Sequence, residues 1–424
     1  KRQRLSYSRQ ESFDASPKRH PYRVDYRIGA RQDGRLTGIQ VRIKANTGGY
    51  DAHGQYIPDY AVTASGGPYR WQAVDARAES VYTNGPKSGQ FRGFGNSQSA
   101  FALECTLDEM AERLGIDPLD LRLKNALVDG AISFLGYPVA ESMGYTQVLE
   151  TIRPHYRALL EEAPEFKADG ALRKGVGLAG MWYRFGKSGS LRVEAHAELA
   201  PDGHFLVYAS APDYGQGTNT MLSQLAAETL ETSRDRIELI NADTALTPDS
   251  GIQGASRSTY FVGGAVCQAA RNLRLAIDAT AAELLDCPPT DISIERGNVI
   301  CTSAPARKIS LETVAAEFDR MGMSCKFPGF YDLTPEFPDE TRPEYVPLFC
   351  TAAQVAEVIV DLRTGAVQVL RVVVVQDVGR AVNPVDARGQ LEGAVMMGLG
   401  AALMEEFIPG VTSGFGDYYP VSYT

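Results

Sequence analysis

The sequence predicts an α+β protein with several mixed β-sheets and packed helices. A strand–turn–strand pattern occurs three times, segments with helical spacing lie between its copies, and the 424 residues are 44% hydrophobic. Such a chain can bury ample core and is long enough for two to three domains. Paired strands combined with separate helices are typical of α+β folds.

The repeated pattern consists of two alternating segments joined by a tight turn. The three turns lie at Gln32-Asp33-Gly34 in residues 22–48, at Pro201-Asp202-Gly203 in residues 191–217, and at Thr364-Gly365 in residues 355–384. Asp-Gly and Thr-Gly pairs flanked by alternating residues are typical of β-hairpins. Three copies of one unit predict several sheets and suggest internal duplication.

Helices are predicted between the hairpins. Helical spacing or a helix cap marks Ser97–Leu114, a helix begun by Asp117 and Pro118, Asn219–Leu230 and Gly264–Leu285. The polar segment Glu162–Lys174 lacks periodicity and predicts a domain boundary between residues 145 and 175. Residues 326–347 contain five prolines and predict a long irregular connection.

Composition and charge exclude several classes of function. The net charge of −10 argues against nonspecific nucleic-acid binding. The longest apolar stretch, Gly393–Met404, is too short to span a membrane, and no apolar segment follows the basic first residues as it would in a signal peptide. We therefore expect a cytoplasmic protein without a membrane partner.

Metal binding by protein side chains is not predicted. The six cysteines are widely separated and form no C-x-x-C pair, and the five histidines show no metal-ligand spacing. These patterns argue against a structural zinc site and against an iron–sulfur cluster built from this chain.

The first of four candidate loops is GQFRGFGNSQ, residues 89–98. Arg92 is a fixed cation between glycines, and an arginine held by a bare backbone can make a bidentate contact with an oxyanion. The alternative is a surface turn in which Phe94 packs into the core.

The second loop is DYGQGTNT, residues 213–220, between a predicted strand and a predicted helix. The N–H groups at a helix N-terminus can bind a polar or anionic ligand. This loop has no lysine, and Gln216 offers both donors and acceptors, which favours a neutral polar ligand. An ordinary turn is the alternative.

The third and fourth loops precede helices. GIQGASRST, residues 251–259, carries the hydroxyls of Ser256, Ser258 and Thr259, one of which would otherwise simply cap the next helix. Residues 376–400 turn at Asn383-Pro384 and are predicted to enter a glycine-rich helix at Gly389-Gln390. Its glycines lie at 389, 393, 398 and 400. Each weakens a helix by up to about 1 kcal/mol, so we expect something to pack close to that backbone.

Taken in order, the four loops resemble those of the molybdenum-binding subunit of the xanthine oxidase family of molybdenum hydroxylases. QFRGFGNSQ resembles the family's Phe-Arg-Gly-Phe-Gly motif and DYGQGTNT its Gly-Gln-Gly loop. ASRST resembles its pterin loop, and residues 377–400 resemble its C-terminal motif. Lys18-Arg19-His20-Pro21 and Lys124-Asn125 match further family positions.

The resemblance implies an elongated two-domain molybdopterin-binding architecture. Residues 1–150 would form the C-terminal part of a first molybdopterin-binding domain, and residues 151–424 a second domain that is incomplete at its C-terminus. The implied enzyme is an oxidoreductase that hydroxylates an electron-poor carbon with water. Its cofactor would be molybdopterin with molybdenum, usually as a cytosine dinucleotide in bacterial members. Electrons would pass to iron–sulfur clusters and FAD on partner chains of a higher hetero-oligomer.

The resemblance also implies roles for individual residues. Arg92 and Gln216 would lie at the metal as catalytic residues, and Phe94 would pack on an aromatic substrate. The implied cofactor-binding residues are Gly93, Phe94, Gly95, Gly215, Gln216, Gly217, Ala255, Ser256, Ser258 and Gln390. Many neutral hydrogen bonds of about 1 kcal/mol each can retain a large cofactor without a lysine.

The sequence also departs from the family pattern. The family's upstream glycine-rich loops, and its Gly-x-Gly-Glu element with the glutamate base, have no counterpart in the 424 residues. Glu405 and Glu406 are not assigned to that role. We expect other polypeptide to complete the site, from a divided gene or a longer chain. The missing glutamate favours the alternative of a noncatalytic scaffold subunit.

Two positions bear on the substrate. Tyr60 stands where purine-oxidising relatives carry a substrate-binding arginine, and Gln90 stands where relatives often have a small residue. Tyrosine offers a ring and a hydroxyl but no cation, so xanthine itself is not favoured. The prediction is a nitrogen heteroaromatic, purine- or nicotinate-like, with aldehydes second. The electron acceptor, the dinucleotide form and the oligomer count stay open.

Overall fold

The computed structural model describes residues 5–139, 143–162, 170–184, 192–254, 256–332 and 349–417. They belong to two compact units. The first contains Lys1–Arg184, Pro347–Gly379 and Leu391–Thr424, and the second contains Phe185–Val346 and Arg380–Gln390. These units are defined by contacts within the folded chain and do not test the domain limits expected at residues 150 and 151, which stay a prediction.

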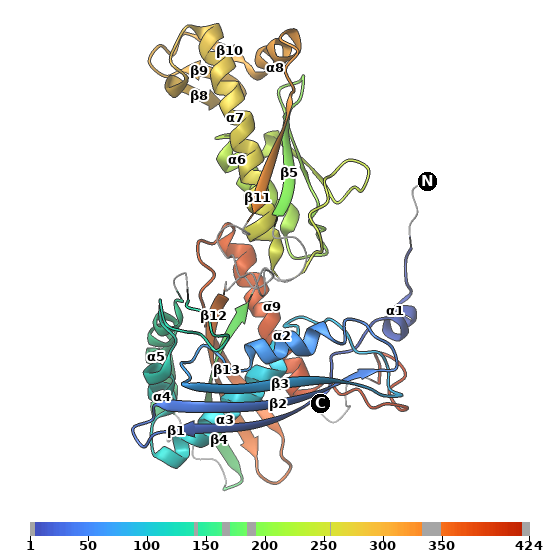
Figure 1. Ribbon diagram of the computed structural model, residues 1–424, viewed down its shortest axis with the longest axis vertical. Helices are drawn as coiled ribbons and strands as arrows, with labels where there is room; N and C mark the ends of the chain where they lie inside the picture. The colour runs from blue at the N-terminus through green and yellow to red at the C-terminus, as the bar shows by residue number, and fades with distance from the viewer. Residues whose placement is uncertain are drawn as a thin grey trace. The chain divides into compact units, whose positions relative to one another are not determined.

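The first sheet of the first unit contains β1 (Tyr22–Ala30), β2 (Leu36–Gly48) and β3 (Ala73–Tyr82), drawn in blue in Figure 1. β1 pairs antiparallel with β2, which confirms the first predicted hairpin, and β3 runs parallel to β2. Buried residues alternate along β2, so one of its faces lies on the core. Asn125 closes the hairpin turn, because its side chain binds Leu36 N at 2.9 Å and Gly34 O at 2.8 Å.

The second sheet of this unit has the order β13-β12-β4 and is antiparallel throughout. Its strands are β4 (Leu172–Arg184), β12 (Phe349–Asp361) and β13 (Val367–Gln376). β12 and β13 form the third predicted hairpin. The helices of the unit are α1 (Arg9–Ala15), α2 (Tyr56–Ala64), α3 (Asn96–Leu114), α4 (Pro118–Asn125) and α5 (Tyr145–Glu162). α5 packs against β12 and β13.

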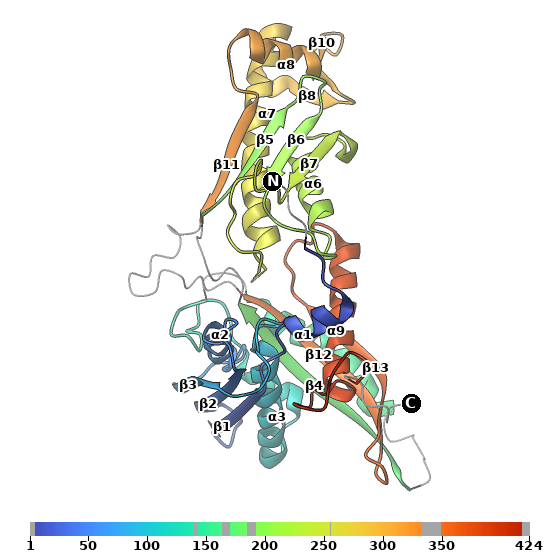
Figure 2. The same cartoon turned by 90° about the vertical axis from the view of Figure 1, so that its right-hand side faces the viewer.

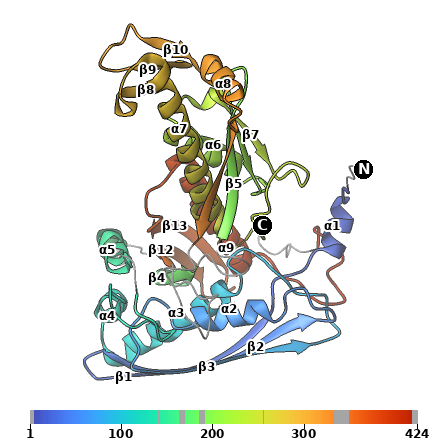
Figure 3. The same ribbon diagram turned by 45° about the horizontal axis from the view of Figure 1, so that its top comes forward.

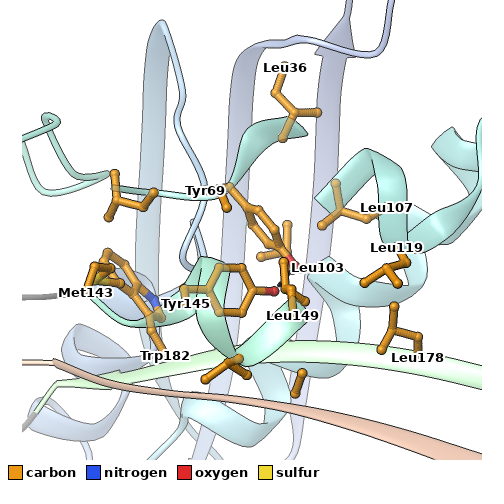
Figure 4. Close-up of a cluster of buried hydrophobic side chains, with 14 of the residues drawn as sticks. Leu36, Tyr69, Leu103, Leu107, Leu119, Met143, Tyr145, Leu149, Leu178 and Trp182 are labelled. Carbon is orange, nitrogen blue, oxygen red and sulfur yellow. Dashed lines mark hydrogen bonds between the residues drawn. The ribbon is translucent and has the colours of Figure 1, made fainter. Parts of the chain in front are cut away.

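The core of the first unit joins these helices to both sheets (Figure 4). Tyr69 and Tyr145 lie among leucines from α3, α4 and α5, and their hydroxyls are 2.9 Å apart. The Tyr69 hydroxyl also donates to Glu104 Oε1 at 2.8 Å. Arg122 Nε donates to Glu104 Oε2 at 2.8 Å, and the two side chains are 0% and 5% exposed. This buried ion pair fixes α3, whose first residue, Asn96, lies within the first candidate loop.

The second unit is built on the sheet β11-β5-β6-β7. Its strands are β5 (Arg192–Leu199), β6 (Phe205–Ala209), β7 (Ile237–Asn241) and β11 (Lys326–Asp332). β5 and β6 form the second predicted hairpin. The long helix α7 (Gly263–Leu285) lies beside β11 and β5, as Figures 1 and 2 both show. Alanines and leucines along α7 form much of the core of this unit.

Smaller elements complete the second unit. The strands β8 (Ile292–Glu295), β9 (Asn298–Cys301) and β10 (Lys308–Ser310) form a sheet near one end of α7 (Figure 3). The helix α8 (Leu311–Arg320) lies at the same end. The remaining helices are α6 (Thr218–Thr229), the short η2 (Arg234–Arg236), η4 (Pro289–Asp291) and η3 (Ser258–Val262), a π-helical turn that runs into α7.

The fold class and the predicted helices are confirmed, with two corrections. Lys326–Asp332 is not irregular but forms strand β11, in which Pro328 is tolerated because β11 is an edge strand. The remaining residues of that predicted connection, 333–347, lie outside the described residues. The glycine-rich helix α9 (Pro384–Leu403) begins at Pro384 and not at Gly389. Asn383 begins it, since Asn383 Oδ1 accepts from Asp386 N at 3.2 Å.

Within the described ranges, no helix combines the length and apolar character that a membrane crossing requires.

Candidate functional site

The loop before α3 has an unusual backbone. Gly93, Phe94 and Gly95 have φ values of 95°, 46° and 89° in succession. A non-glycine residue pays a steric cost at such angles, so the position of Phe94 must be held by its surroundings. Glycine is required at Gly95, where a Cβ atom would lie 2.8 Å from Ile57 O. The loop is therefore a rigid platform and not an adaptable surface turn.

Arg19, from the Lys18-Arg19-His20-Pro21 motif, fastens this platform. Its Nη2 donates to Arg92 O at 3.0 Å and its Nη1 to Ser97 Oγ at 3.1 Å. The same guanidinium lies 4.2 Å from the centroid of the Phe91 ring. Arg19 thus positions the loop by holding its backbone and does not itself act in the site.

Phe94 packs against Tyr60 of α2. The two ring centroids are 5.6 Å apart at an interplanar angle of 88°, an edge-to-face pair. Tyr60 is 2% exposed, and burial raises the pKa of its hydroxyl well above the usual value. Two residues that the sequence linked to substrate recognition therefore adjoin each other in the first unit.

Sequence reasoning missed a cation at this place. Arg184, the last residue of β4, is buried, and its guanidinium carbon lies 4.9 Å from the centroid of the Tyr60 ring. The distance is typical of a cation–π contact. Leu178, Gly180 and Trp182 are buried on the same face of β4, so the alternation of the strand could have predicted an inward Arg184.

Two other polar residues lie on the same loop. Gln90 is exposed, and its Oε1 is 3.0 Å from Nδ1 of His53. Arg92 is exposed as well, and its Nη1 lies 3.8 Å from Sδ of Met397 in α9. Gln90 and Arg92 are thus exposed on the loop that also carries Phe94.

The DYGQG loop in the second unit uses its helix N-terminus differently from the prediction. Asp213 accepts from Asn219 N at 2.9 Å and from Gly215 N at 2.9 Å. These N–H groups hold the pKa of Asp213 below its usual range. The N–H group of Asn219, in the first turn of α6, is therefore engaged by a carboxylate of the loop and is not left for a ligand. A second anion would meet this carboxylate, so a neutral ligand fits the loop better.

Gln216 is held within its own loop. Its Nε2 donates to Pro212 O at 3.0 Å and to Thr218 Oγ1 at 2.8 Å, and its Oε1 accepts from Tyr214 N at 2.8 Å. Both amide hydrogens are used, while the carbonyl oxygen can accept one further bond. Gly215 has a φ of 115°, and a Cβ there would meet no atom of the described residues within 4 Å. The loop therefore presents bare backbone to open space.

The third loop lies before η3 and α7. Ser256 is exposed in the left-handed region, with a φ of 57°, and Ser258 Oγ accepts a hydrogen bond from Gln253 Nε2. Ala255 lies outside the described residues. Arg257 is buried, with its guanidinium carbon 4.7 Å from the Phe261 ring centroid. A strained serine beside a π-helical turn is a common feature of functional sites.

The first turns of α9, including Gln390, belong to the second unit. A Cβ on Gly217 would lie 3.1 Å from Asp386 Oδ2, so α9 begins close to the DYGQG loop. Asn383 Nδ2 donates to the same Asp386 Oδ2 at 2.7 Å. The second unit thus brings Gly215, Gln216 and Gly217 near the start of α9.

The loops of the second unit fit a large, mostly neutral ligand. The open backbone at Gly215 and the remaining acceptor of Gln216 suit a polar ring system. Among the described residues, no three His, Cys, Asp or Glu side chains are grouped so that they could hold a metal ion.

Comparison with known proteins agrees with this geometry. Two family models, each described as a molybdopterin cofactor-binding domain, match residues 1–126 and 151–423. The xanthine dehydrogenase molybdenum-binding subunit of Escherichia coli O157:H7 is 31% identical over 422 residues, covering 97% of this chain and 54% of the relative. The aldehyde oxidoreductase of Megalodesulfovibrio gigas is 30% identical over 413 residues, covering 95% of this chain and 42% of the relative.

A solved structure shows the same fold. The aldehyde oxidoreductase from Desulfovibrio gigas superposes with a TM-score of 0.85 at 26% identity, covering 97% of this chain and 43% of that chain. This chain thus spans about half the length of the curated relatives that it matches. The family match extends over most of the sequence and includes all four loops. The chain therefore belongs to the molybdopterin cofactor-binding domain family, and it is similar to molybdenum-binding subunits of xanthine dehydrogenases.

Proposed function

We propose that this chain is the molybdopterin-binding part of a molybdenum hydroxylase acting on a nitrogen heteroaromatic substrate, purine- or nicotinate-like. The reaction would insert a hydroxyl group from water at an electron-poor carbon. The single observation that supports an aromatic substrate is the strained backbone of Gly93, Phe94 and Gly95, which holds the Phe94 ring against Tyr60. Strain of this kind persists at sites where a ring must be placed accurately.

The cofactor we propose is molybdopterin with molybdenum, as a cytosine dinucleotide. When bound, it would supply the redox chemistry and take up the two electrons removed from the substrate. The residues we assign to its binding share bare backbone or a neutral hydrogen-bonding group. They are Gly93, Phe94, Gly95, Gly215, Gln216, Gly217, Ala255, Ser256, Ser258 and Gln390.

The chain's own side chains would act by binding and orientation. Gln216 would use the remaining acceptor capacity of Oε1, because its Nε2 hydrogens are engaged at Pro212 and Thr218. Arg92 would orient an oxyanion, since its guanidinium is exposed on a rigid loop. The general base is a glutamate that we place on other polypeptide, because no residue of this chain is assigned to that role.

Three residues would read the substrate. Phe94 and Tyr60 would pack on the aromatic ring, and Gln90 would read a polar substituent from its exposed position beside His53. The guanidinium of Arg184 beside Tyr60 would complement an oxo or carboxylate group on a substrate ring that packs at this pair.

A second candidate is aldehyde oxidation, favoured by the 30% identity to an aldehyde oxidoreductase. A third is a noncatalytic scaffold subunit of such an assembly. For the two catalytic readings we propose an assembly with iron–sulfur and FAD chains, together with the rest of the molybdenum-binding polypeptide. Chains of these kinds are needed to receive the electrons.

The test is metal analysis of the natively purified assembly, followed by turnover assays. We expect about one molybdenum per copy of this chain, and higher kcat/KM for hydroxy- or carboxy-substituted N-heteroaromatics than for aromatic aldehydes. The reverse order of kcat/KM would support aldehyde oxidation instead. An assembly without molybdenum, purified from cells in which a related molybdenum enzyme is active, would support the scaffold.

A further inference from the structure

The part of α9 in the first unit, Leu391–Leu403, exposes an apolar face. Gly393, Met396, Met397 and Gly400 follow each other at spacings of three, one and three residues, so they share one side of the helix. We refer to these four residues as the methionine–glycine face. Met396 is 66% exposed and Met397 is 37% exposed. Over the described chain, no residue of α9 is buried.

Nothing in the described part of the chain requires glycine at Gly393 or Gly400. A Cβ on Gly393 would meet no described atom within 4 Å, and a Cβ on Gly400 would lie 2.5 Å from Oε1 of Glu405, the end of a long side chain that can turn away. Neither glycine has a positive φ. Glycine in a helix costs about 0.5–1 kcal/mol relative to alanine. The cost is explained if another backbone packs closely against these positions.

The chemistry of the face suits a protein partner. From Gly389 to Met404 the only charged residue is Glu392. Methionine is enriched in the cores of protein interfaces because its flexible side chain fits irregular surfaces. A long apolar helix with no buried residue is unusual in a protein that works alone.

We propose that the methionine–glycine face is the docking surface for an apolar segment of the remaining molybdenum-binding polypeptide, whether separate from this chain or continuous with it. This inference rests on the proposed function. The occupant is indicated by length, since this chain covers 54% of a curated relative while matching it over 97% of its own residues. The face also adjoins Arg92 through Met397, so the occupant would lie beside the candidate site.

The first test compares two substitutions on the same helix in the native assembly. Gly393→Leu places a large side chain on the face, whereas Gly398→Leu places it on the opposite side, where a Cβ also meets nothing within 4 Å. Both changes favour the isolated helix, so neither acts by weakening α9. We expect hydrogen exchange of the α9 amides to become about tenfold faster or more in G393L only, because overpacking weakens docking. Equal rates in both variants would overturn the proposal.

The second test identifies the occupant. A photo-crosslinking amino acid at Met396 should form its adduct with the remaining molybdenum-binding polypeptide, mapped by peptide mass spectrometry. An adduct with a second copy of this chain, with an iron–sulfur or FAD chain, or with no protein at all would overturn it. Molybdenum is measured on the same sample. The expected adduct without molybdenum would leave the docking proposal standing while contradicting the proposed function.

Discussion

Nη1 of Arg92 lies 3.8 Å from Sδ of Met397, which joins the loop before α3 to helix α9 within the first unit. A thioether is a weak acceptor and carries no charge. The contact therefore positions the guanidinium on its platform without neutralising it. Because Arg19 holds the backbone carbonyl of the same Arg92 at 3.0 Å, both ends of the residue are oriented by motifs far apart in the sequence.

Replacing Arg92 by methionine removes the cation while keeping much of the side chain's volume. We expect kcat/KM of the assembled enzyme to fall about 100-fold or more, as when a preorganised oxyanion contact is lost. Molybdenum content and assembly should not change. The matched control is Arg23→Met, because Arg23 has a side chain 79% exposed on β1. Unchanged turnover in R92M would contradict the role given to Arg92.

Asp213 predicts a defined pH dependence of stability. Hydrogen bonds from Asn219 N and Gly215 N hold its pKa below the ordinary value of 3.8. A carboxyl group with a lowered folded-state pKa stabilises the protein above its unfolded-state pKa, and this contribution is lost as the pH falls through the folded-state pKa. Wild type should therefore melt at a higher temperature than Asp213→Asn at pH 7.

The difference between wild type and D213N should shrink as the pH falls below about 3.8, the ordinary value for an aspartate. Thermal melts between pH 2.5 and 7 would check this. As a control, Asp249→Asn changes another loop aspartate that accepts from a single glycine N–H, of Gly251. A difference between wild type and D213N that stays constant over the whole range would rule out the proposed hydrogen bonding of the Asp213 carboxylate.

Gly95 and Gly115 allow packing to be separated from backbone strain. Both have positive φ, 89° and 66°, and they flank the two ends of α3. Alanine at either position pays about 1–2 kcal/mol for the left-handed backbone. A Cβ at Gly95 would also lie 2.8 Å from Ile57 O, whereas one at Gly115 meets nothing within 4 Å.

G95A should therefore lower the free energy of unfolding by about 1–3 kcal/mol more than G115A, because only G95A overpacks the junction of α2 and α3. Urea unfolding of the two variants measures the difference. Equal losses would mean that α2 can move away from the loop at little cost.

Much of the fold could be predicted from local signals. The three hairpins followed from alternation around Asp-Gly and Thr-Gly turns, and α3 and α7 followed from helical spacing, to within one residue at their starts. Strand β11 could not be predicted in the same way. Its proline is compatible with a strand only because β11 is the edge strand of its sheet. This position depends on pairing with β5, which lies more than a hundred residues earlier in the sequence.

The candidate site was predictable as a set of loops but not in its hydrogen bonding. Glycines at 93, 95, 215 and 217 indicated turns of restricted backbone, and all four have positive φ. The closure of the DYGQG loop by Asp213 and Gln216 depends on which donors reach them in space. The pairing of Arg184 with Tyr60 joins strand β4 to helix α2, and no local pattern contains both residues.

Glu104 should be a stability determinant of the first unit. It accepts from Arg122, Tyr69 and Gly180, so its loss removes the more buried of the two carboxylates that pair with the Arg122 guanidinium, the other being that of Asp108. Glu104→Gln should lower the free energy of unfolding by about 3–5 kcal/mol.

Glu109→Gln changes an exposed glutamate of the same helix, whose pair with Arg113 is solvent-screened, and should cost at most about 0.5 kcal/mol. Both tryptophans, Trp71 and Trp182, lie in this unit, so their fluorescence during urea unfolding reports on it. Similar losses in the two variants would contradict the buried pair's role.

Arg184 provides the sharpest test of substrate recognition. Its guanidinium lies beside the Tyr60 ring, which in turn meets Phe94 edge to face. Arg184→Met keeps the length of the side chain and removes its charge. A lost hydrogen bond to a charged group costs about 1.5–3 kcal/mol, so KM for a carboxy- or oxo-substituted N-heteroaromatic should rise roughly 10- to 100-fold. KM for the unsubstituted ring should change little, because stacking on Phe94 and Tyr60 does not need the cation.

Arg173→Met is the matched control, since Arg173 lies on the same strand but is exposed. Should R184M raise KM equally for both substrates, Arg184 would act by supporting Tyr60 in the core, and the substituent would be read elsewhere.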